Sequence, residues 1–198
     1  MENEPGIGER NESSKRRRRW QVIIGTALAI VAGGLTTTVI DYVNRPREFT
    51  SVVGGFLVTT PVKLEESKQT QDMGWGKLEV HNFAGRKGNA GFGVMYIDYP
   101  QEIIDRDDPN AMLERGVKGA VSSLGGTLLH ESTIFINGNP GRDIVVELQK
   151  EGTDGTYCSR CYLVKNRLYE VGVAAEGKYR GPNKEINNFL NSFKLTGD

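Results

Sequence analysis

The pattern of apolar and polar residues divides the chain into a polar N-terminal stretch, one long uncharged stretch and a remainder of short periodic segments. Residues 1–14 carry almost no apolar side chains, so they cannot bury enough surface to offset the entropy cost of ordering, and we predict that they are disordered. No charged side chain lies between Gln21 and Ile40. A helix over these residues would be about 30 Å long, which is the thickness of a bilayer core. We therefore predict a transmembrane helix over residues 20–43 that contacts the lipid bilayer through residues 21–40.

The flanks of this stretch are typical of a membrane-spanning segment. Trp20 and Tyr42 lie at its two ends, where aromatic rings favour the level of the lipid headgroups. A block of basic residues, 15–19, precedes it, whereas only Arg45 and Arg47 follow closely. The positive-inside rule then keeps residues 1–19 in the cytoplasm and places the C-terminal domain on the other side. We expect a single-pass protein of the cell membrane with an extracytoplasmic domain.

Two other interpretations of the uncharged stretch stay open. Ala27 and Ala29 have the small-x-small form of a signal-peptide cleavage site, although cleavage there would leave a very short apolar region. A helix buried inside a soluble protein is the other alternative, but residues 21–40 show no polar face. Pro46 ends the predicted helix, and residues 44–48 are predicted to be a linker.

Beyond this linker, the periodicity of residues 49–198 predicts mostly strands. Leu78, Val80 and Asn82 alternate with polar residues, which is typical of a half-buried strand. Aromatic and β-branched residues favour a further strand over residues 92–99. The other predicted strands cover residues 56–60, 62–65, 127–137, 142–149, 156–164 and 168–174. The last two are joined by residues 165–167, in which Asn166 can adopt positive φ, so they are predicted to form a β-hairpin.

Two helices are predicted among these strands. Asp108 and Pro109 have the residue types of an N-cap and a first helical position, and Gly125 supplies the stop. The apolar positions at helical spacing in this first helix are Leu113, Val117, Ala120 and Leu124.

The second helix is predicted to begin at Pro182. It carries a stripe of large apolar residues formed by Ile186, Phe189, Leu190 and Phe193, which must dock on a sheet to be covered. Few helices among many hairpin-connected strands predict an α+β fold with an antiparallel sheet and helices packed on it.

Charge and cysteine content narrow the function classes. The chain has 25 basic and 25 acidic side chains, but the basic block at residues 15–19 leaves residues 48–198 slightly acidic. A slightly acidic domain lacks the basic surface that nucleic-acid binding requires, so no nucleic-acid partner is expected. Two cysteines are too few for a disulfide scaffold.

The sharpest local motif is the CxxC formed by Cys158 and Cys161. Redox motifs of this kind work at a helix N-terminus, whereas these cysteines lie in a predicted strand. Three residues apart on a strand places them on opposite faces, which disfavours a disulfide or a shared metal. We expect one core cysteine and one exposed cysteine, with a thiol redox or metal-handling role for the pair as the alternative.

No other group of residues predicts a catalytic, cofactor or metal site. His81 and His130 lie on predicted strands without a Ser or Cys in a nucleophile motif, so both are interpreted as surface or hydrogen-bonded histidines. Asp105, Asp107 and Asp108 lack the glycine and distal glutamate of an EF-hand loop, so they are assigned to helix capping and solvation, with weak calcium binding as the alternative. Residues 138–141 and 152–155 are predicted to be turns.

Several segments together resemble the PsbP-like family, whose founding members are extrinsic subunits of photosystem II and whose relatives are widespread among exported bacterial proteins. The similar segments are residues 49–64, 94–100, 113–129, 136–146, 161–173 and 186–195. This resemblance implies an α-β-α sandwich around an antiparallel sheet. Because the segments consist of turn glycines and core positions, they indicate a fold rather than a photosystem role. We expect a non-enzymatic domain that binds a protein partner or assists the assembly of an envelope complex.

The predicted orientation can be tested with a C-terminal tag on the full chain in intact cells. We expect the tag to be accessible from outside the cytoplasm, because the basic residues at 15–19 retain the N-terminus inside. An N-terminal tag on the same chain is the matched control and should stay protected. A C-terminal tag found in the cytoplasm would overturn the orientation.

Overall fold

The computed structural model of the chain describes residues 46–72, 76–150 and 153–197. The predicted tail over residues 1–19 and the predicted transmembrane helix over residues 20–43 lie outside the described residues. Within the described ranges, no helix has both the length and the apolar character needed to cross a membrane.

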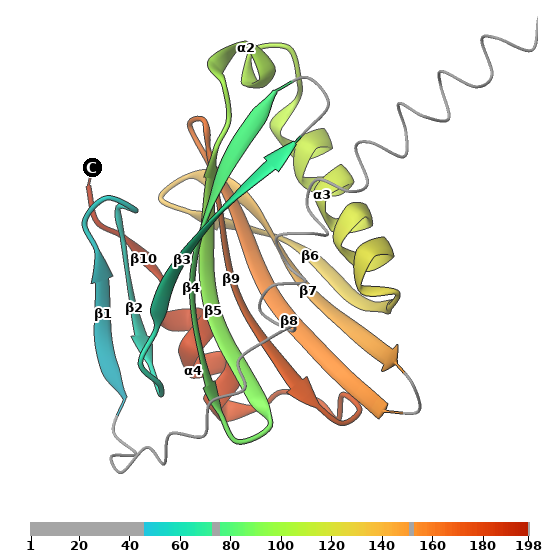
Figure 1. The fold of residues 1–198 in the computed structure, drawn as a ribbon. Helices are drawn as coiled ribbons and strands as arrows, with labels where there is room; N and C mark the ends of the chain where they lie inside the picture. The colour runs from blue at the N-terminus through green and yellow to red at the C-terminus, as the bar shows by residue number, and fades with distance from the viewer. Residues whose placement is uncertain (1–45, 73–75, 151–152, 198) are drawn as a thin grey trace, which may run out of the picture.

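The described residues form ten strands and three helices, which Figure 1 labels in chain order. The strands are β1 (Arg47–Ser51), β2 (Phe56–Thr60), β3 (Glu65–Asp72), β4 (Lys77–Lys87), β5 (Ala90–Asp98), β6 (Thr127–Ile136), β7 (Asn139–Lys150), β8 (Thr153–Val164), β9 (Arg167–Glu176) and β10 (Lys194–Leu195). The helices are α2 (Gln101–Ile104), α3 (Pro109–Leu124) and α4 (Lys184–Ser192).

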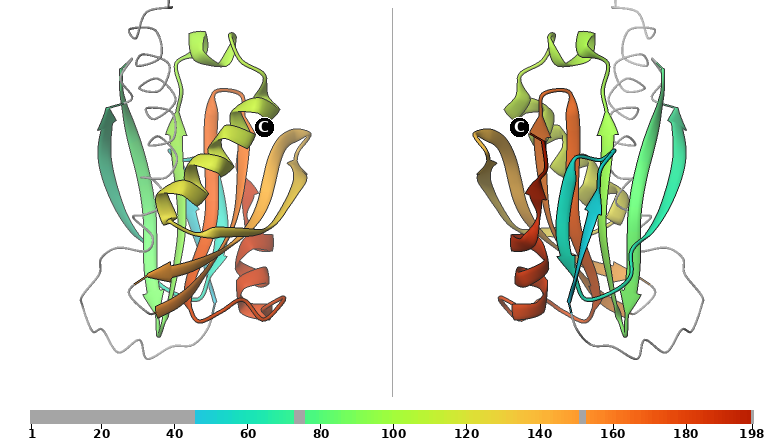
Figure 2. Two further views of the ribbon diagram at one scale, coloured as in Figure 1. Left: turned by 90° about the vertical axis from the view of Figure 1, so that its right-hand side faces the viewer. Right: turned by 90° about the vertical axis from the view of Figure 1, so that its left-hand side faces the viewer.

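Seven of the strands form one curved antiparallel sheet in the order β3-β4-β5-β9-β8-β7-β6. A second sheet has the order β1-β2-β10. Helix α3 packs on one face of the large sheet, whereas α4 and the three-stranded sheet lie against the other (Figures 1 and 2). The α+β class with an antiparallel sheet is therefore confirmed. The three-stranded sheet was not predicted, because β10 is only two residues long and joins β2 from the far end of the chain.

The central strands of the large sheet bury side chains on both faces. On β7, Val145 packs into the core on the α4 side, whereas its neighbours Ile144 and Val146 pack under α3. On β8, Tyr162 and Leu163 divide between the two sides in the same way. A sheet that is apolar on both faces must be covered on both faces, which explains why helices lie on either side of it.

Aromatic rings fill the core on the α4 side. Phe189 of α4 meets Phe92 of β5 edge to face with ring centroids 5.3 Å apart. Phe193 stacks on Tyr162 of β8 with centroids 5.9 Å apart and lies 5.7 Å from Phe56 of β2. These contacts confirm that the last helix docks on the sheet, and they join α4, β2 and the large sheet into one core.

Helix α3 begins and ends as predicted. The Asp108 side chain accepts a hydrogen bond from the Ala111 amide at 2.9 Å, and Pro109 takes the first helical position. Gly125 ends the helix in the left-handed region at φ 60°. The buried face includes Gly116 and Ala120, and these small residues allow the helix axis to approach β7 and β8 closely.

Two turns differ from their predicted form. In the β8–β9 hairpin, Lys165 adopts the positive φ of 55°, not Asn166. The Asn166 side chain instead donates a hydrogen bond to the Tyr99 carbonyl at 2.9 Å, which holds it in place. Between β6 and β7 the reversal lies at Asn137 and Gly138, both at positive φ. The residues after Gly138 in the predicted turn at 138–141 belong to β7.

Three element boundaries were wrong, and one strand was missed. Residues 62–65 do not form a strand before Glu65, because Val62 and Leu64 are buried in the connection that leads into β3. Strand β3 was not predicted, because almost every side chain in it is exposed and no apolar alternation marks it.

Two elements start at other residues than predicted. Helix α4 starts at Lys184 with Asn183 as its N-cap, two residues after Pro182. Strand β1 starts at Arg47, inside the range predicted to be a linker.

Replacing Phe189 with Asp should destabilise the domain by several kcal/mol, about 3–5, because a charge would enter the aromatic core. Phe189 is only 1% exposed. Chemical denaturation of the purified domain measures the change in unfolding free energy. Asn188→Asp, on the exposed side of the same helix, is the control and should change it little. An unchanged midpoint for Phe189→Asp would refute the docking of α4.

Candidate functional site

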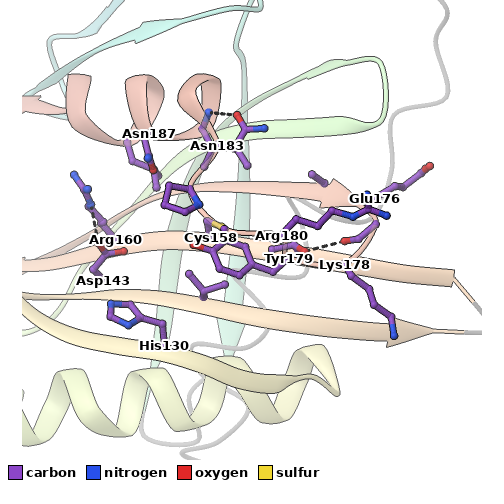
Figure 3. Close-up of a pocket in the computed structure, with 18 of the residues that line it drawn as sticks. His130, Asp143, Cys158, Arg160, Glu176, Lys178, Tyr179, Arg180, Asn183 and Asn187 are labelled. Atoms are coloured by element: carbon purple, nitrogen blue, oxygen red, sulfur yellow. Dashed lines mark hydrogen bonds and ion pairs between the residues drawn. The ribbon is translucent and has the colours of Figure 1, made fainter.

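A cleft of about 780 Å³ lies between strands β6 to β9 and the segment formed by α4 and the loop before it. Figure 3 shows the side chains that line it, with His130 and Asp143 on one side and the loop residues Lys178, Tyr179 and Arg180 on the other. The volume lies in the range of pockets that hold small molecules. The cleft is open to solvent and polar at its rim.

Strand register explains how residues far apart in sequence meet on the floor of the cleft. His130, Val145 and Cys158 lie directly opposite one another on β6, β7 and β8. Asp143 and Arg160 form the next such pair on β7 and β8. Directly opposite residues share a face of the sheet, so both rows point toward α4.

Arg160 connects the strands on the floor of the cleft to helix α4, which lies over them. Its Nε lies 3.4 Å from the Asp143 carboxylate, and its Nη1 donates a hydrogen bond to the Asn191 side chain on α4 at 2.7 Å. Asp143 therefore compensates the Arg160 charge, and the Arg160 side chain is only 21% exposed. Arg160 is best assigned to holding α4 over the sheet, and it leaves little free charge for a ligand.

The loop between β9 and α4 supplies the uncompensated charge. Gly177 and Gly181 adopt φ of 97° and 104°, backbone conformations that favour glycine. The Gly177 carbonyl accepts a hydrogen bond from the Thr156 hydroxyl at 2.8 Å, which anchors the start of the loop.

Two basic side chains of this loop line the cleft. Lys178 lies 4.0 Å from Asp154. Arg180 is exposed and forms no hydrogen bond or ion pair with any described residue.

The two cysteines do not meet in the fold. Cys158 lies under the cleft, and Cys161 lies on the opposite face under α3, so the predicted separation is confirmed and both thiols are free. Burial raises the pKa of Cys158 to about 11 and that of Cys161 to about 12, so both stay protonated at neutral pH. The expectation that one cysteine of the pair is exposed was wrong, because Cys158 is buried and Cys161 is partly covered under α3.

The two histidines occupy different environments, and neither pairs with a thiol. His130 and Cys158 are separated by β7, which places their strands about 9.6 Å apart, too far for proton transfer between their side chains. His81 donates through Nε2 to the Glu79 carboxylate at 2.7 Å and stacks on Tyr96 with ring centroids 4.3 Å apart. The interpretation of His81 as a hydrogen-bonded strand residue is therefore confirmed.

The three aspartates near α3 serve the start of that helix. Asp108 is the N-cap, and Asp107 pairs with Arg115, about two helical turns further on. Asp105 accepts a hydrogen bond from Gln101 at 2.8 Å. In the ranges that the structure describes, no group of three or more His, Cys, Asp or Glu side chains is placed to hold a metal ion.

A buried carboxyl under α3 is the titratable group that the sequence analysis missed. Glu170 is 4% exposed, and its carboxyl accepts a hydrogen bond from the Tyr157 hydroxyl at 3.0 Å. Burial raises the pKa of Glu170 to about 7, although the hydroxyls of Ser159 and Tyr157 partly oppose this shift. It borders a small cavity of about 30 Å³ between α3 and the sheet. The only sequence signal for the burial of Glu170 is that a single acidic residue interrupts the apolar run of β9.

No protein-family model matches the chain, and no curated protein matches it in sequence. Among solved structures, cyanobacterial PsbP (CyanoP) from Synechocystis sp. PCC 6803 matches with a TM-score of 0.53 at 11% identity, over 82% of this chain and 99% of that chain. The described domain therefore has a PsbP-like fold, as the sequence resemblance implied. At this identity the likeness extends to the fold alone.

Two further solved structures are more distant. A protein of unknown function from Pseudomonas aeruginosa matches with a TM-score of 0.38 at 19% identity, over 55% of this chain and 82% of that chain. A protein from Bacteroides thetaiotaomicron matches with a TM-score of 0.44 at 12% identity, over 79% of this chain and 50% of that chain. Similarity at TM-scores this low does not establish a shared fold.

Glu170 should make stability fall with rising pH. Its pKa is about 7 when folded and 4.5 when exposed, so its contribution is complete below pH 4.5 and is lost as the pH rises to 7. The loss is about 3 kcal/mol at ~1.4 kcal/mol per pKa unit. Urea unfolding of wild type and Glu170→Gln at several pH values measures it.

Glu170→Gln should lack this loss between pH 4.5 and 7, because a neutral amide does not titrate. The exposed Glu176→Gln is the control and should keep the wild-type slope. Equal slopes for wild type and Glu170→Gln would show that the carboxyl is not buried in its neutral form.

Proposed function

We propose that this chain is a membrane-anchored, non-enzymatic binding module whose extracytoplasmic domain holds a segment of a partner protein in the cleft beneath α4. The observation that carries the proposal is the cleft itself, about 780 Å³ in volume and rimmed by polar side chains that include the uncompensated Arg180. Tethered beside the membrane, such a module would serve the assembly of an envelope complex.

The anchor in this proposal rests on the sequence. The uncharged stretch between Gln21 and Ile40, the basic block before it and the aromatic residues at its ends all favour a single-pass segment with the N-terminus in the cytoplasm. The described domain begins at Pro46, a few residues after the predicted span. A tether this short would keep the domain within a few nanometres of the lipid surface.

The side chains of the cleft support binding over catalysis. The Cys158 thiol is protonated at neutral pH because burial raises its pKa to about 11. His130 lies two strands away from it, so the described cleft residues do not form a nucleophile and base pair. No observation favours the alternative of a thiol or metal-handling protein, because Cys158 and Cys161 face opposite sides of the sheet.

The charge of the rim indicates the chemistry of the partner. The carboxylate of Glu176 forms an ion pair with Arg86 at 3.5 Å, and that of Asp143 forms one with Arg160. Arg180 remains as a positive charge without an ionic partner among the described residues, and Lys178 has only a long contact to Asp154. A partner segment that carries an acidic side chain would therefore be favoured at this rim.

Reversing the Arg180 charge should weaken partner binding. We expect Arg180→Glu to lower the amount of co-purified partner about tenfold, which corresponds to ~1.4 kcal/mol of binding free energy. The full chain with an affinity tag is purified from solubilised membranes, and bound proteins are quantified by mass spectrometry.

Arg106→Glu is the matched control. Arg106 is also an exposed arginine without a partner among the described residues, but it follows α2 at the other end of the molecule from α4 (Figure 1). It should leave the co-purified proteins unchanged. If the two variants recover the same proteins in the same amounts, the cleft is not the binding site.

A further inference from the structure

The two edges of the seven-stranded sheet have opposite chemical characters. The edge strand β3 carries Glu65, Glu66 and Lys68, whose charges discourage another strand from pairing with it. The other edge strand, β6, carries Leu128, Leu129 and Phe135, which are 37%, 46% and 67% exposed. Charges protect one edge, whereas apolar side chains are displayed on the other.

The backbone of β6 is suited to pairing over most of its length. Its register with β7 shifts between Leu128 and His130 and is then regular through residues 130–136. β6 pairs with β7 alone among the described strands. On a regular edge strand every second residue directs its N–H and C=O away from the sheet, so these groups on β6 have no strand partner in the part of the chain that the structure describes.

The same strand forms the outer edge of the cleft floor. His130 lies on β6 and lines the cleft together with Cys158 and Arg160 of β8. Residues 130, 132, 134 and 136 alternate with 131, 133 and 135, so the second set, which includes Phe135, points to the face that α3 covers. A strand added beside β6 would extend the floor of the cleft and also cover Phe135.

We propose that β6 is the docking edge for the partner segment, which adds to the sheet as an extended strand beside residues 130–136. This inference rests on the proposed function and specifies how the partner binds. A strand is the occupant that satisfies the outward backbone groups of β6, whereas a helix satisfies its own backbone and would leave them to water.

The chemistry of the two faces defines the segment. Its side chains on the α3 side of the sheet include an apolar residue that packs against Phe135, and its side chains on the other side enter the cleft. An acidic residue among the latter matches the uncompensated charge of Arg180. Alternating apolar and polar residues are therefore the sequence signature of the partner segment.

Photo-crosslinking in the native membrane tests this arrangement. A photo-reactive phenylalanine replaces Thr133 or Phe135 in the full chain, and the crosslinked peptides are mapped by mass spectrometry. Thr70 on β3, also an exposed edge position, is the control. Because 133 and 135 are neighbours on one face of β6, we expect their crosslinks on one partner segment, displaced by two residues, and none from position 70.

A charged variant gives a second measurement. Phe135→Lys should lower the co-purified partner about tenfold, because the lysine would lie where the partner's apolar residue packs. The melting temperature should stay the same, since Phe135 is 67% exposed. Thr70→Lys on β3 is the matched control and should leave the partner bound.

The outcomes separate this proposal from the proposed function. Loss of the partner in Arg180→Glu but not in Phe135→Lys, or crosslinks from β6 without the ordered displacement, leaves the cleft as the site and overturns strand addition. Crosslinks from β6 to a second copy of this chain overturn it as well, since β6 is then a self-association edge. Full binding by both charged variants overturns both proposals.

Discussion

The structure depends on one constraint, which is that the central strands of the large sheet are apolar on both faces. Alternate residues of β7 and β8 belong to different cores, as Val145 and Val146 do. Neither face can be left to water, so the chain must supply a cover for each. Helix α3 covers one face, and α4 with the three-stranded sheet covers the other. The fit of each cover decides which part of the sheet stays open to solvent.

The cover on the α4 side is incomplete, and the cleft is the consequence. Helix α4 is only 9 residues long and packs against β2, β8 and β9, so it does not reach the β6 end of the sheet. The uncovered part of that face carries polar side chains such as His130 and Asp143. The opposite cover is tighter, and it encloses Glu170, whose pKa rises to about 7 because a charge there would lose its hydration.

The incomplete cover also connects the two proposals. The same strand that borders the cleft is the edge that lacks a neighbour among the described strands and carries exposed Phe135. A partner strand beside β6 would complete the sheet, extend the floor of the cleft and bring an acidic group toward Arg180. The PsbP-like fold provides the scaffold, while the proposed function rests on side chains at one edge of it.

The sequence alone determined the elements whose pattern reports burial on one side. The stripe of Phe189 and Leu190, the cap at Asp108 and the alternation in β4 were each predicted, because local spacing follows directly from helix and strand geometry. It also determined that Cys158 and Cys161 face opposite sides of the sheet.

Strand β3 was not predicted, because a strand with almost every side chain exposed has no apolar periodicity. Only the tertiary structure decided that Arg160 meets Asn191, that burial raises the pKa of Glu170 and that β6 is an edge. These features depend on strand order and on contacts between residues far apart in the chain.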